Sequence, residues 1–390
     1  METEDSIYRK LQRFLDRMPA GFPEVESGLD IRLLKRLFAP EEAELAIQLS
    51  MKPEPLRRIY GRVKKSGMSL EKLQKLVGQM THKGTILVSE EGYAEKHYSN
   101  AAFSVGGIYN YQVDRLTKDL IEEYWQYQSE ARAKARPVVK ATKKNRAKRM
   151  LPLRTIPVEK SIPLPEKMQV SRYDDVRKLI ENVRGKIAIA NCICRQSRDI
   201  LGKPCTKTDL RETCLIIGPD HARRHVDMGI GRFISKEEAL GILEKAQEAG
   251  LVLQPENSKR PEAICCCCGD CCVLLKRVIE APRPADLYVT NYYVEVIPEL
   301  CNGCEACVRI CQLDARMMTD GISTVNLDRC IGCGNCVTVC ETQATCLRRK
   351  EEEMPLFKDK EDYHMTMLSN RVGKKKMLLL KTKMRLGLKV

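Results

Sequence analysis

The chain has few aromatic residues and no long apolar run. Aromatic residues account for 5% of its 390 residues, and there is a single Trp. The core must therefore rely on Leu, Ile, Val, Ala and Met side chains. The longest apolar run, near residues 186–194, is well short of the roughly 18 residues that a membrane-spanning helix needs. We therefore expect no transmembrane segment.

The beginning of the chain lacks the pattern of a secretory signal peptide. Residues 1–5 read Met-Glu-Thr-Glu-Asp, and no apolar stretch follows them, whereas a signal peptide has a basic start and then an apolar region. Nineteen cysteines in a small secreted chain would indicate disulfides. In a chain of this length without a signal peptide, they indicate free thiols in a reducing compartment. We expect a cytoplasmic protein of an anaerobic or low-oxygen cell.

Motifs for nucleotide binding and for hydrolysis are also missing. Gly229-Ile230-Gly231 lacks the third glycine of a dinucleotide fingerprint, and no phosphate-binding loop occurs. We find no Ser–His–Asp set and no pair of catalytic carboxylates. These absences leave open whether the chain is an enzyme, and they favour a subunit that transfers electrons over a stand-alone catalyst.

The chain is strongly basic. It has 67 Lys and Arg against 52 Asp and Glu, a formal net charge of +15. Such a surplus suits nucleic acid, an anionic membrane surface or an acidic redox partner, and composition does not choose among them. Residues 131–150 contain basic residues and no acidic one, and four prolines follow between 152 and 165. This pattern indicates an extended linker.

Two cysteine runs of identical spacing lie near the end of the chain. Residues 301–311 read C-N-G-C-E-A-C-V-R-I-C and residues 330–340 read C-I-G-C-G-N-C-V-T-V-C, so C-x2-C-x2-C-x3-C occurs twice. This spacing is typical of [4Fe–4S] binding, because a tight loop can present three thiolates to three corners of one cube. Zinc sites instead tend to have two C-x2-C pairs separated by a longer loop.

Residues of about 290–350 resemble the bacterial-type two-[4Fe–4S] ferredoxin domain. The resemblance implies two halves, each with a strand, a cluster loop, a short helix and a strand. It also implies that the last cysteine of each run serves the other cluster. One cluster would then be held by Cys301, Cys304, Cys307 and Cys340, and the second by Cys330, Cys333, Cys336 and Cys311. The sequence departs from the family where Gln312 and Glu341 replace the Pro that usually follows the fourth cysteine.

Ten further cysteines lie between residues 192 and 272, six of them within eight positions. We expect at least one additional iron–sulfur cluster here, with zinc as the rival metal. Arg195, next to Cys194, would stabilise thiolates and raise the cluster potential. The spacing does not identify the ligands, and adjacent cysteines rarely bind one metal together. The candidates are Cys192, Cys194, Cys205, Cys214, Cys265, Cys266, Cys267, Cys268, Cys271 and Cys272.

The region before the first cysteine is predicted to be mainly helical. Apolar residues recur at helical spacing over residues 31–49 and 56–65. Ser69 is a plausible N-cap for a helix that Gly84 ends, and residues 85–99 read as a β-hairpin. This order resembles a winged-helix domain over residues of about 30–100. Winged helices bind DNA or dock proteins, and the mixed side chains of helix 69–83 do not favour DNA.

These observations predict an α+β protein with several domains. We expect a helical winged-helix-like domain at 1–130, a basic and proline-rich linker at 131–167 and a small α/β cysteine-rich domain at 168–285. A ferredoxin-like domain at 286–350 and a basic C-terminal tail at 351–390 complete the chain. The overall layout resembles the multidomain 4Fe–4S dicluster ferredoxin-type proteins of anaerobic microbes.

The leading functional hypothesis is an iron–sulfur protein that passes single electrons to or from an anaerobic oxidoreductase, as a subunit or dedicated partner. The alternative is a redox-responsive DNA-binding regulator, in which the winged helix contacts DNA and the clusters sense oxygen or reductant. A third hypothesis is a reductase that uses the middle cysteines as an open cluster site.

Overall fold

The computed structural model describes residues 4–90, 92–104, 106–134, 151–162, 171–385 and 389. The chain divides into two compact units. The first contains residues 1–139, 223–231 and 364–390, and the second contains residues 140–222 and 232–363. Of the expected linker, residues 135–150 and 163–167 lie outside the described residues, as do residues 168–170 of the next expected domain.

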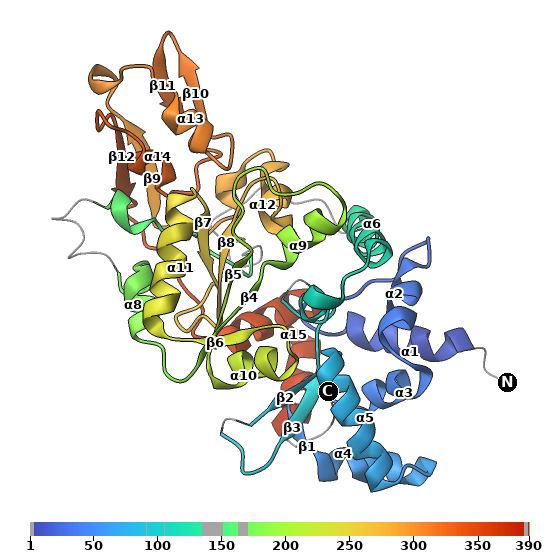
Figure 1. Cartoon of the computed structure of the whole chain (residues 1–390). Coiled ribbons are helices and arrows are strands. Elements are labelled where there is room, and N and C mark those ends of the chain that lie inside the picture. The colour runs from blue at the N-terminus through green and yellow to red at the C-terminus, as the bar shows by residue number, and fades with distance from the viewer. Residues whose placement is uncertain are drawn as a thin grey trace. The chain divides into compact units, whose positions relative to one another are not determined.

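The first unit contains helices and one small sheet (Figure 1). Strands β1 (Glu54–Pro55), β2 (Ile86–Ser89) and β3 (His97–Asn100) form an antiparallel sheet of order β1-β3-β2. The Lys72 N–H donates to Ser69 Oγ at 3.1 Å, so Ser69 caps the helix as predicted, and Gly84 ends that helix with φ of 73°. The helices are α1 (Glu4–Asp16), α2 (Leu29–Leu37), α3 (Pro40–Gln48), α4 (Leu56–Val63), α5 (Leu70–Lys83) and α6 (Lys118–Lys134), with 3₁₀ turns η1 (Lys64–Ser66) and η2 (Asn110–Arg115).

The second unit is built on a five-stranded antiparallel sheet of order β6-β4-β5-β8-β7. Its strands are β4 (Ile187–Asn191), β5 (Glu212–Ile217), β6 (Arg232–Ile234), β7 (Val252–Pro255) and β8 (Ala263–Cys267). Helices α8 (Val176–Glu181) and α11 (Lys236–Glu248) pack together, and α11 contacts β4, β5 and β7. Two further helices, α9 (Ile193–Ile200) and α12 (Val273–Ile279), follow β4 and β8 along the chain.

The remaining helices connect these parts. Helix α10 (Pro219–Asp227) begins in the second unit, and its residues from 223 belong to the first. Helix α15 (Lys360–Arg385) is interrupted by the non-helical Gly373, and its residues from 364 belong to the first unit. Short 3₁₀ turns occur at η4 (Glu159–Ser161), η5 (Pro284–Asp286) and η6 (Pro298–Leu300).

The two cysteine runs form a ferredoxin-type domain in the second unit. Strands β9 (Tyr292–Val296) and β12 (Thr345–Arg349) pair antiparallel, as do β10 (Arg316–Thr319) and β11 (Ile322–Val325). With helices α13 (Ala306–Ile310) and α14 (Asn335–Thr338), the order strand, cysteine loop, helix, strand occurs twice, as β9-α13-β10 and β11-α14-β12. This confirms the repeat expected from the sequence (Figure 1, orange to red).

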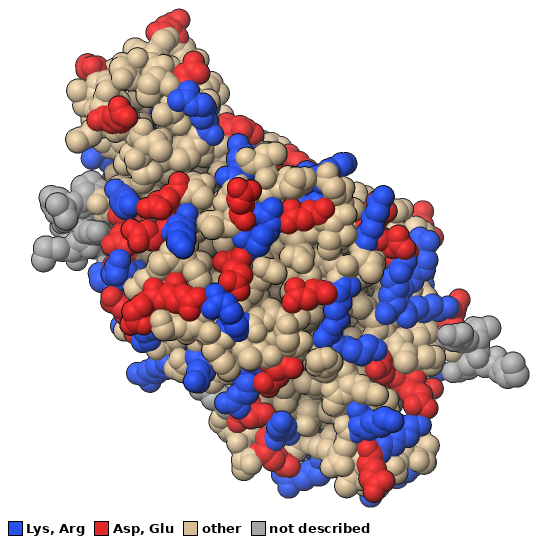
Figure 2. Space-filling view, viewed as in Figure 1, with Lys and Arg blue, Asp and Glu red and all other residues tan. Residues whose placement is uncertain are grey.

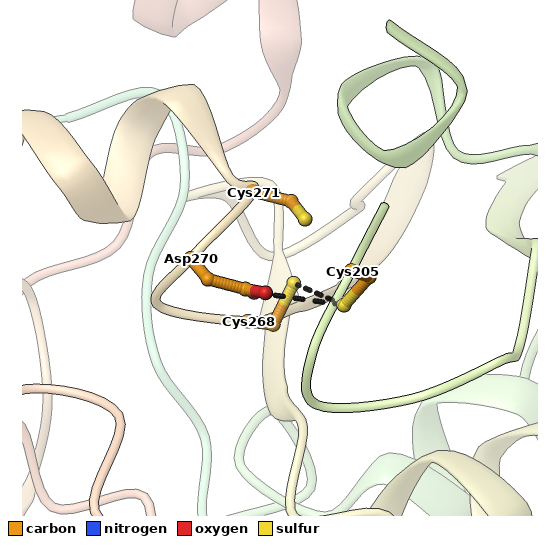
Figure 3. Close-up of side chains that lie close together, drawn as sticks. All are labelled: Cys205, Cys268, Asp270 and Cys271. Carbon is orange, nitrogen blue, oxygen red and sulfur yellow. Dashed lines mark hydrogen bonds between the residues drawn. The ribbon is translucent and has the colours of Figure 1, made fainter. Parts of the chain in front are cut away.

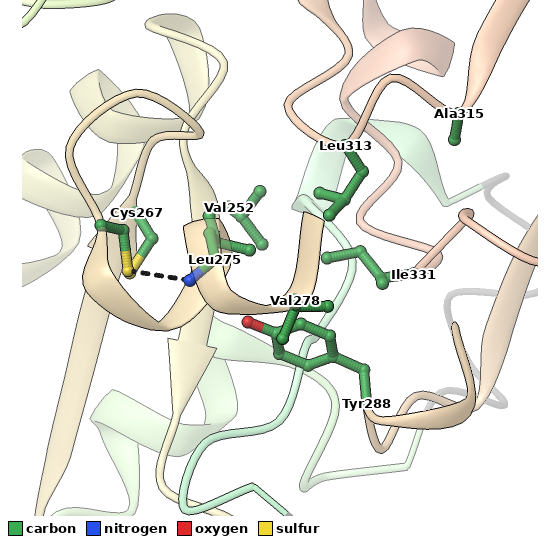
Figure 4. Close-up of a cluster of buried hydrophobic side chains, with 9 residues drawn as sticks. Val252, Cys267, Leu275, Val278, Tyr288, Leu313, Ala315 and Ile331 are labelled. Carbon is green, nitrogen blue, oxygen red and sulfur yellow. Dashed lines mark hydrogen bonds between the residues drawn. The ribbon is translucent and has the colours of Figure 1, made fainter. Parts of the chain in front are cut away.

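One hydrophobic cluster joins this ferredoxin-type domain to the five-stranded sheet. Figure 4 shows Leu275 and Val278 of α12 packed near Leu313 and Ile331, which follow the last cysteine of the first run and the first cysteine of the second run. Tyr288 also belongs to the cluster and is 4% exposed. Burial of aliphatic side chains of this kind stabilises by about 1.5–3 kcal/mol each. The cluster therefore holds the two cysteine-rich parts of the second unit together.

The segment 151–162 also packs along this junction. The Arg154 and Ile156 N–H groups donate to the carbonyls of Pro255 and Leu253 at 3.0 and 3.3 Å, so the segment runs beside β7. The Val158 N–H then donates to the Cys333 carbonyl at 2.9 Å. The described residues that follow the basic run thus lie against the second cysteine loop.

Gln312 is one of the two departures from the ferredoxin pattern, and it makes contacts that a Pro could not make. The Gly269 N–H donates to Gln312 Oε1 at 2.8 Å, and Gln312 Nε2 donates to the Gly250 carbonyl at 3.0 Å. Asn335 Nδ2 donates to the same Gly250 carbonyl at 2.6 Å. Two residues beside the cysteine loops of the ferredoxin-type domain therefore bind the backbone just before β7 and just after β8.

Gly269→Ala is expected to weaken this junction. A Cβ on Gly269 would lie 2.6 Å from the Gln312 carbonyl oxygen, closer than real Cβ contacts allow. Forcing the two backbones apart should lower the free energy of unfolding by about 1–3 kcal/mol. Gly241→Ala in α11 is the matched control, since nothing lies within 4 Å of its Cβ, and it should be neutral or stabilise by about 0.4–1 kcal/mol. Anaerobic denaturation with guanidinium measures both; equal midpoints would contradict the expectation.

Candidate metal centres

Four thiols of the ferredoxin-type domain line one cavity. Cys311 from the first run and Cys330, Cys333 and Cys336 from the second line it. Burial raises the pKa of the Cys333 thiol to about 12. The N–H groups of Gly332 and Val294 interact with the Cys330 sulfur and counteract the effect of its burial. Four cysteines from both runs around one cavity are a ligand set that fits a [4Fe–4S] cluster.

Three of the other four cysteines of the two runs, Cys301, Cys307 and Cys340, contact Ser323 or Thr345. The Ser323 N–H donates to Cys301 Sγ at 3.4 Å, and Ser323 Oγ lies 3.0 Å from Cys307 Sγ. For Cys340, burial would raise the pKa, but hydrogen bonds from Thr342 and Thr345 lower it. Cys304, the remaining thiol of this set, is exposed. The structure does not bring Cys346 to either set, because its thiol donates to the Gln343 carbonyl at 3.6 Å.

Arg316 lies between the two sets of thiols. Its side chain is buried, and Nη2 donates to Ser323 Oγ at 2.8 Å and to Thr345 Oγ1 at 3.1 Å, on the side of Cys301 and Cys307. It also lines the cavity of Cys330 and Cys336 and lowers their pKa values, against the stronger effect of burial. Its Nε and Nη1 have no hydrogen-bond partner among the described residues. A buried cation with two unpaired donors fits neighbours that become negative when they bind metal.

Six of the ten middle cysteines form a second group of thiols, hereafter the six-cysteine group. The Cys194 thiol interacts with those of Cys192 and Cys272, and the Cys267 thiol with those of Cys272 and Cys265. Cys214 is opposite Cys265 in the pairing of β5 with β8, and their thiols interact. The group is thus Cys192, Cys194, Cys214, Cys265, Cys267 and Cys272.

Two thiols of the six-cysteine group lie at the N-termini of helices. Cys192 and Cys272 are the N-caps of α9 and α12, and the Leu275 N–H donates to Cys272 Sγ at 3.5 Å. Helix N-termini favour negative charge, and the Cys194 and Cys267 thiols lower the pKa of Cys272 to about 5. Figure 4 shows Cys267 beside Leu275 and Val252, on the side of the hydrophobic cluster that faces the sheet.

Alternation along β8 separates Cys266 from this group. Side chains of a strand point alternately to opposite faces, so Cys265 and Cys267 share a face while Cys266 points to the other one. Cys266 is 1% exposed, and burial raises its pKa. Its thiol interacts with no other thiol through a hydrogen bond in the part of the chain described. We interpret Cys266 as a core residue.

Arg195 is fully buried among the middle cysteines. Its Nη1 donates to Thr213 Oγ1 at 2.6 Å and its Nη2 donates to the Cys266 carbonyl at 2.8 Å. Burial alone would lower its pKa, but the sulfurs of Cys192, Cys268, Cys267 and Cys205 raise it. The guanidinium therefore stays charged and interacts with thiols of the six-cysteine group and with others outside it.

Those other thiols form a third, compact group, drawn in Figure 3. Cys205, Cys268 and Cys271 have their sulfurs together with a carboxylate oxygen of Asp270, and all four ligand atoms lie within 4.8 Å of one another. Burial would raise the pKa of Asp270, but hydrogen bonds from Thr206, Cys268 and Cys271 lower it. The sequence analysis included these three cysteines among the candidate ligands but did not include Asp270. An acidic residue within a cysteine-rich turn could have indicated a fourth ligand.

Comparisons with known proteins agree with the ferredoxin-type segment. A family profile described as a 4Fe-4S dicluster domain matches residues 293–341, which contain both cysteine runs. The search of curated proteins and that of solved structures returned no match. Among the described residues, no helix is long and apolar enough to cross a bilayer. The chain thus contains a 4Fe–4S dicluster domain, which is the basis for iron–sulfur electron transfer.

Proposed function

We propose that the chain transfers single electrons to or from an anaerobic oxidoreductase partner, through two [4Fe–4S] clusters in the ferredoxin-type domain and a third cluster on the six-cysteine group. Cys311, Cys330, Cys333 and Cys336 would hold one cluster, and Cys301, Cys304, Cys307 and Cys340 the other. Four thiols of the six-cysteine group would hold the third. A bound [4Fe–4S] cluster supplies reversible one-electron redox chemistry.

One observation supports this proposal most strongly. The hydrophobic cluster that joins the two parts of the second unit contains Cys267 and Cys272 of the six-cysteine group. Three thiols from the cavity of the ferredoxin-type domain pack against the same cluster: Cys311, Cys330 and Cys333. Candidate ligands of two centres therefore border one cluster of buried apolar side chains.

The chain's own residues have three tasks in this function. Leu275, Val278 and Ile331 exclude water between the centres, and a dry environment strengthens charge interactions. Arg195 and Arg316 place positive charge beside the thiolates, which favours the reduced and more negative state of a centre. Gln312 and Asn335 fix the ferredoxin-type domain on the sheet through the Gly250 carbonyl.

Iron content tests the number of clusters. Three [4Fe–4S] clusters correspond to about twelve irons and twelve acid-labile sulfides per chain in anaerobically purified protein. A redox titration followed by electron paramagnetic resonance should then resolve three one-electron centres. About eight irons and eight sulfides would contradict the third cluster and leave the two-cluster domain intact, and iron without sulfide would contradict clusters altogether.

We further propose that the first unit is a winged-helix-like module for docking a protein. The order α3-β1-α4-α5-β2-β3 and the sheet order β1-β3-β2 support the winged-helix interpretation. Contact with DNA is less well supported, because Lys72 and Lys83 of α5 pair with Glu41 and Glu42 at 2.8 and 2.5 Å. On the face drawn in Figure 2, basic and acidic side chains are interspersed. The DNA-binding regulator would gain support from a gel shift with bulk DNA that persists near physiological salt.

A further inference from the structure

The third group of ligands has the dimensions of a site for one metal ion. Cys205 Sγ lies 3.7 Å from Cys268 Sγ and 3.5 Å from Asp270 Oδ1. A tetrahedral ion with metal–sulfur bonds of about 2.3 Å and metal–oxygen bonds of about 2.1 Å places two sulfurs about 3.8 Å apart and a sulfur and an oxygen about 3.6 Å apart. The two observed separations agree with these values.

A cubane cluster would require a wider arrangement. Its four thiolates bind four different irons, so an iron–iron edge separates every pair of ligand sulfurs. The four ligand atoms of the third group all lie within 4.8 Å of one another. In the described part of the chain, only this group meets that condition. The thiols of the six-cysteine group contact one another in pairs and do not all lie within 4.8 Å of one another. We therefore expect the two groups to bind different metal centres.

We propose that Cys205, Cys268, Cys271 and Asp270 bind a single Zn²⁺ ion. Three thiolates and a carboxylate are ligands that Zn²⁺ accepts, and four protein ligands with no open position are typical of a structural site. The site is distinct from the three iron–sulfur centres of the proposed function and does not depend on them.

Asp270 is oriented for this role by contacts outside the site. Its Oδ2 accepts hydrogen bonds from the Thr206 N–H at 2.7 Å and from Thr206 Oγ1 at 3.1 Å, which leaves Oδ1 beside Cys205 Sγ. Ligating carboxylates are commonly held by outer hydrogen bonds of this kind. Figure 3 shows the Asp270 carboxylate pointing toward Cys205 and Cys268.

The ion would connect two loops that are far apart in the sequence. Cys205 lies in the loop between α9 and β5, and Cys268 and Cys271 lie in the turn between β8 and α12. That turn is flanked by Cys267 and Cys272 of the six-cysteine group. A zinc ion at the third group would therefore fix the turn from which two thiols of the neighbouring centre are presented.

Metal analysis of the full chain tests the proposal. Wild-type protein, purified anaerobically and supplied with both iron and zinc, should contain about one zinc per chain in addition to its iron. Cys205→Ser should lose the zinc and keep its iron. Because even loss of an outer-shell partner weakens metal binding about 10–100-fold, we expect the zinc affinity of Cys205→Ser to fall by more than about 100-fold in competition with a chelator.

Two further variants keep the test decisive. Asp270→Asn preserves the shape of the side chain and provides a second test if Cys205→Ser folds poorly. It should weaken zinc binding, but less than Cys205→Ser does. Cys266→Ala removes a neighbouring thiol from outside both groups and should leave the zinc and iron contents unchanged.

Co²⁺ taken up in place of zinc should show the d–d absorption of a tetrahedral thiolate site in wild type and not in Cys205→Ser. Wild-type protein without zinc, or a Cys205→Ser variant that keeps its zinc, would overturn the proposal.

Discussion

Arg195→Met should lower the free energy of unfolding of the cluster-loaded protein by about 3–5 kcal/mol. The Arg195 guanidinium is fully buried and interacts with the sulfurs of Cys192, Cys267, Cys268 and Cys205. Metal binding makes these sulfurs thiolates, so removal of the cation leaves buried negative charge without a partner. The variant also leaves Thr213 Oγ1 and the Cys266 carbonyl without their donor. Anaerobic guanidinium denaturation measures the loss.

Arg195→Met should also make the proposed cluster on the six-cysteine group harder to reduce. A positive charge beside a cluster stabilises its reduced form, so the potential of that centre should fall in Arg195→Met while the two ferredoxin-type centres keep theirs. Arg195→Lys is the control: it retains the charge but cannot make the forked contact to Thr213 and Cys266, and it should recover most of the potential and part of the stability. Equal potentials in wild type and Arg195→Met would contradict a centre at the six-cysteine group.

Substitution of the last cysteine of each run should affect the cluster of the other run. Cys311 lines the cavity with Cys330, Cys333 and Cys336, so Cys311→Ala should disturb the same resonance as Cys333→Ala. Cys340→Ala should disturb the one that Cys304→Ala disturbs. Each variant should lose between about one and four irons, depending on whether the cluster survives with three thiolates. Electron paramagnetic resonance of the reduced proteins distinguishes the two patterns.

The matched positions of the repeat provide the control for this experiment. Cys304 and Cys333 are each the second cysteine of a run, so any difference between their variants reflects the centre and not the position. A Cys311→Ala spectrum that matches Cys304→Ala would contradict the exchange of fourth ligands between runs. Cys346→Ala should leave all signals unchanged, since its thiol faces the Gln343 carbonyl.

The ferredoxin-type domain could be predicted because its signal is local. Ligands of one loop lie within a few residues of one another, so C-x2-C-x2-C spacing reports directly on the shape of that loop. The cap at Ser69 was predictable for the same reason, since Ser69 accepts from an N–H three residues later.

The division of the ten middle cysteines could not be predicted, because it depends on contacts between distant segments. Cys214 meets Cys265 only because β5 pairs with β8, and Cys205 meets Cys268 across 63 residues of sequence. The roles of Gln312 and Arg316 could not be predicted for a related reason. Each acts through a partner in another element, and the spacing of cysteines contains no information on such contacts.

The unpaired donors of Arg316 have a consequence for how the protein matures. In the absence of clusters, the fold would hold a desolvated guanidinium with two donors unsatisfied among the described residues, a cost of several kcal/mol. The empty ferredoxin-type domain should therefore be open and poorly ordered, and insertion of its clusters becomes the last step of its folding. Cofactor supply would then control the amount of folded protein, and chelation of iron during synthesis should direct the chain to proteolysis.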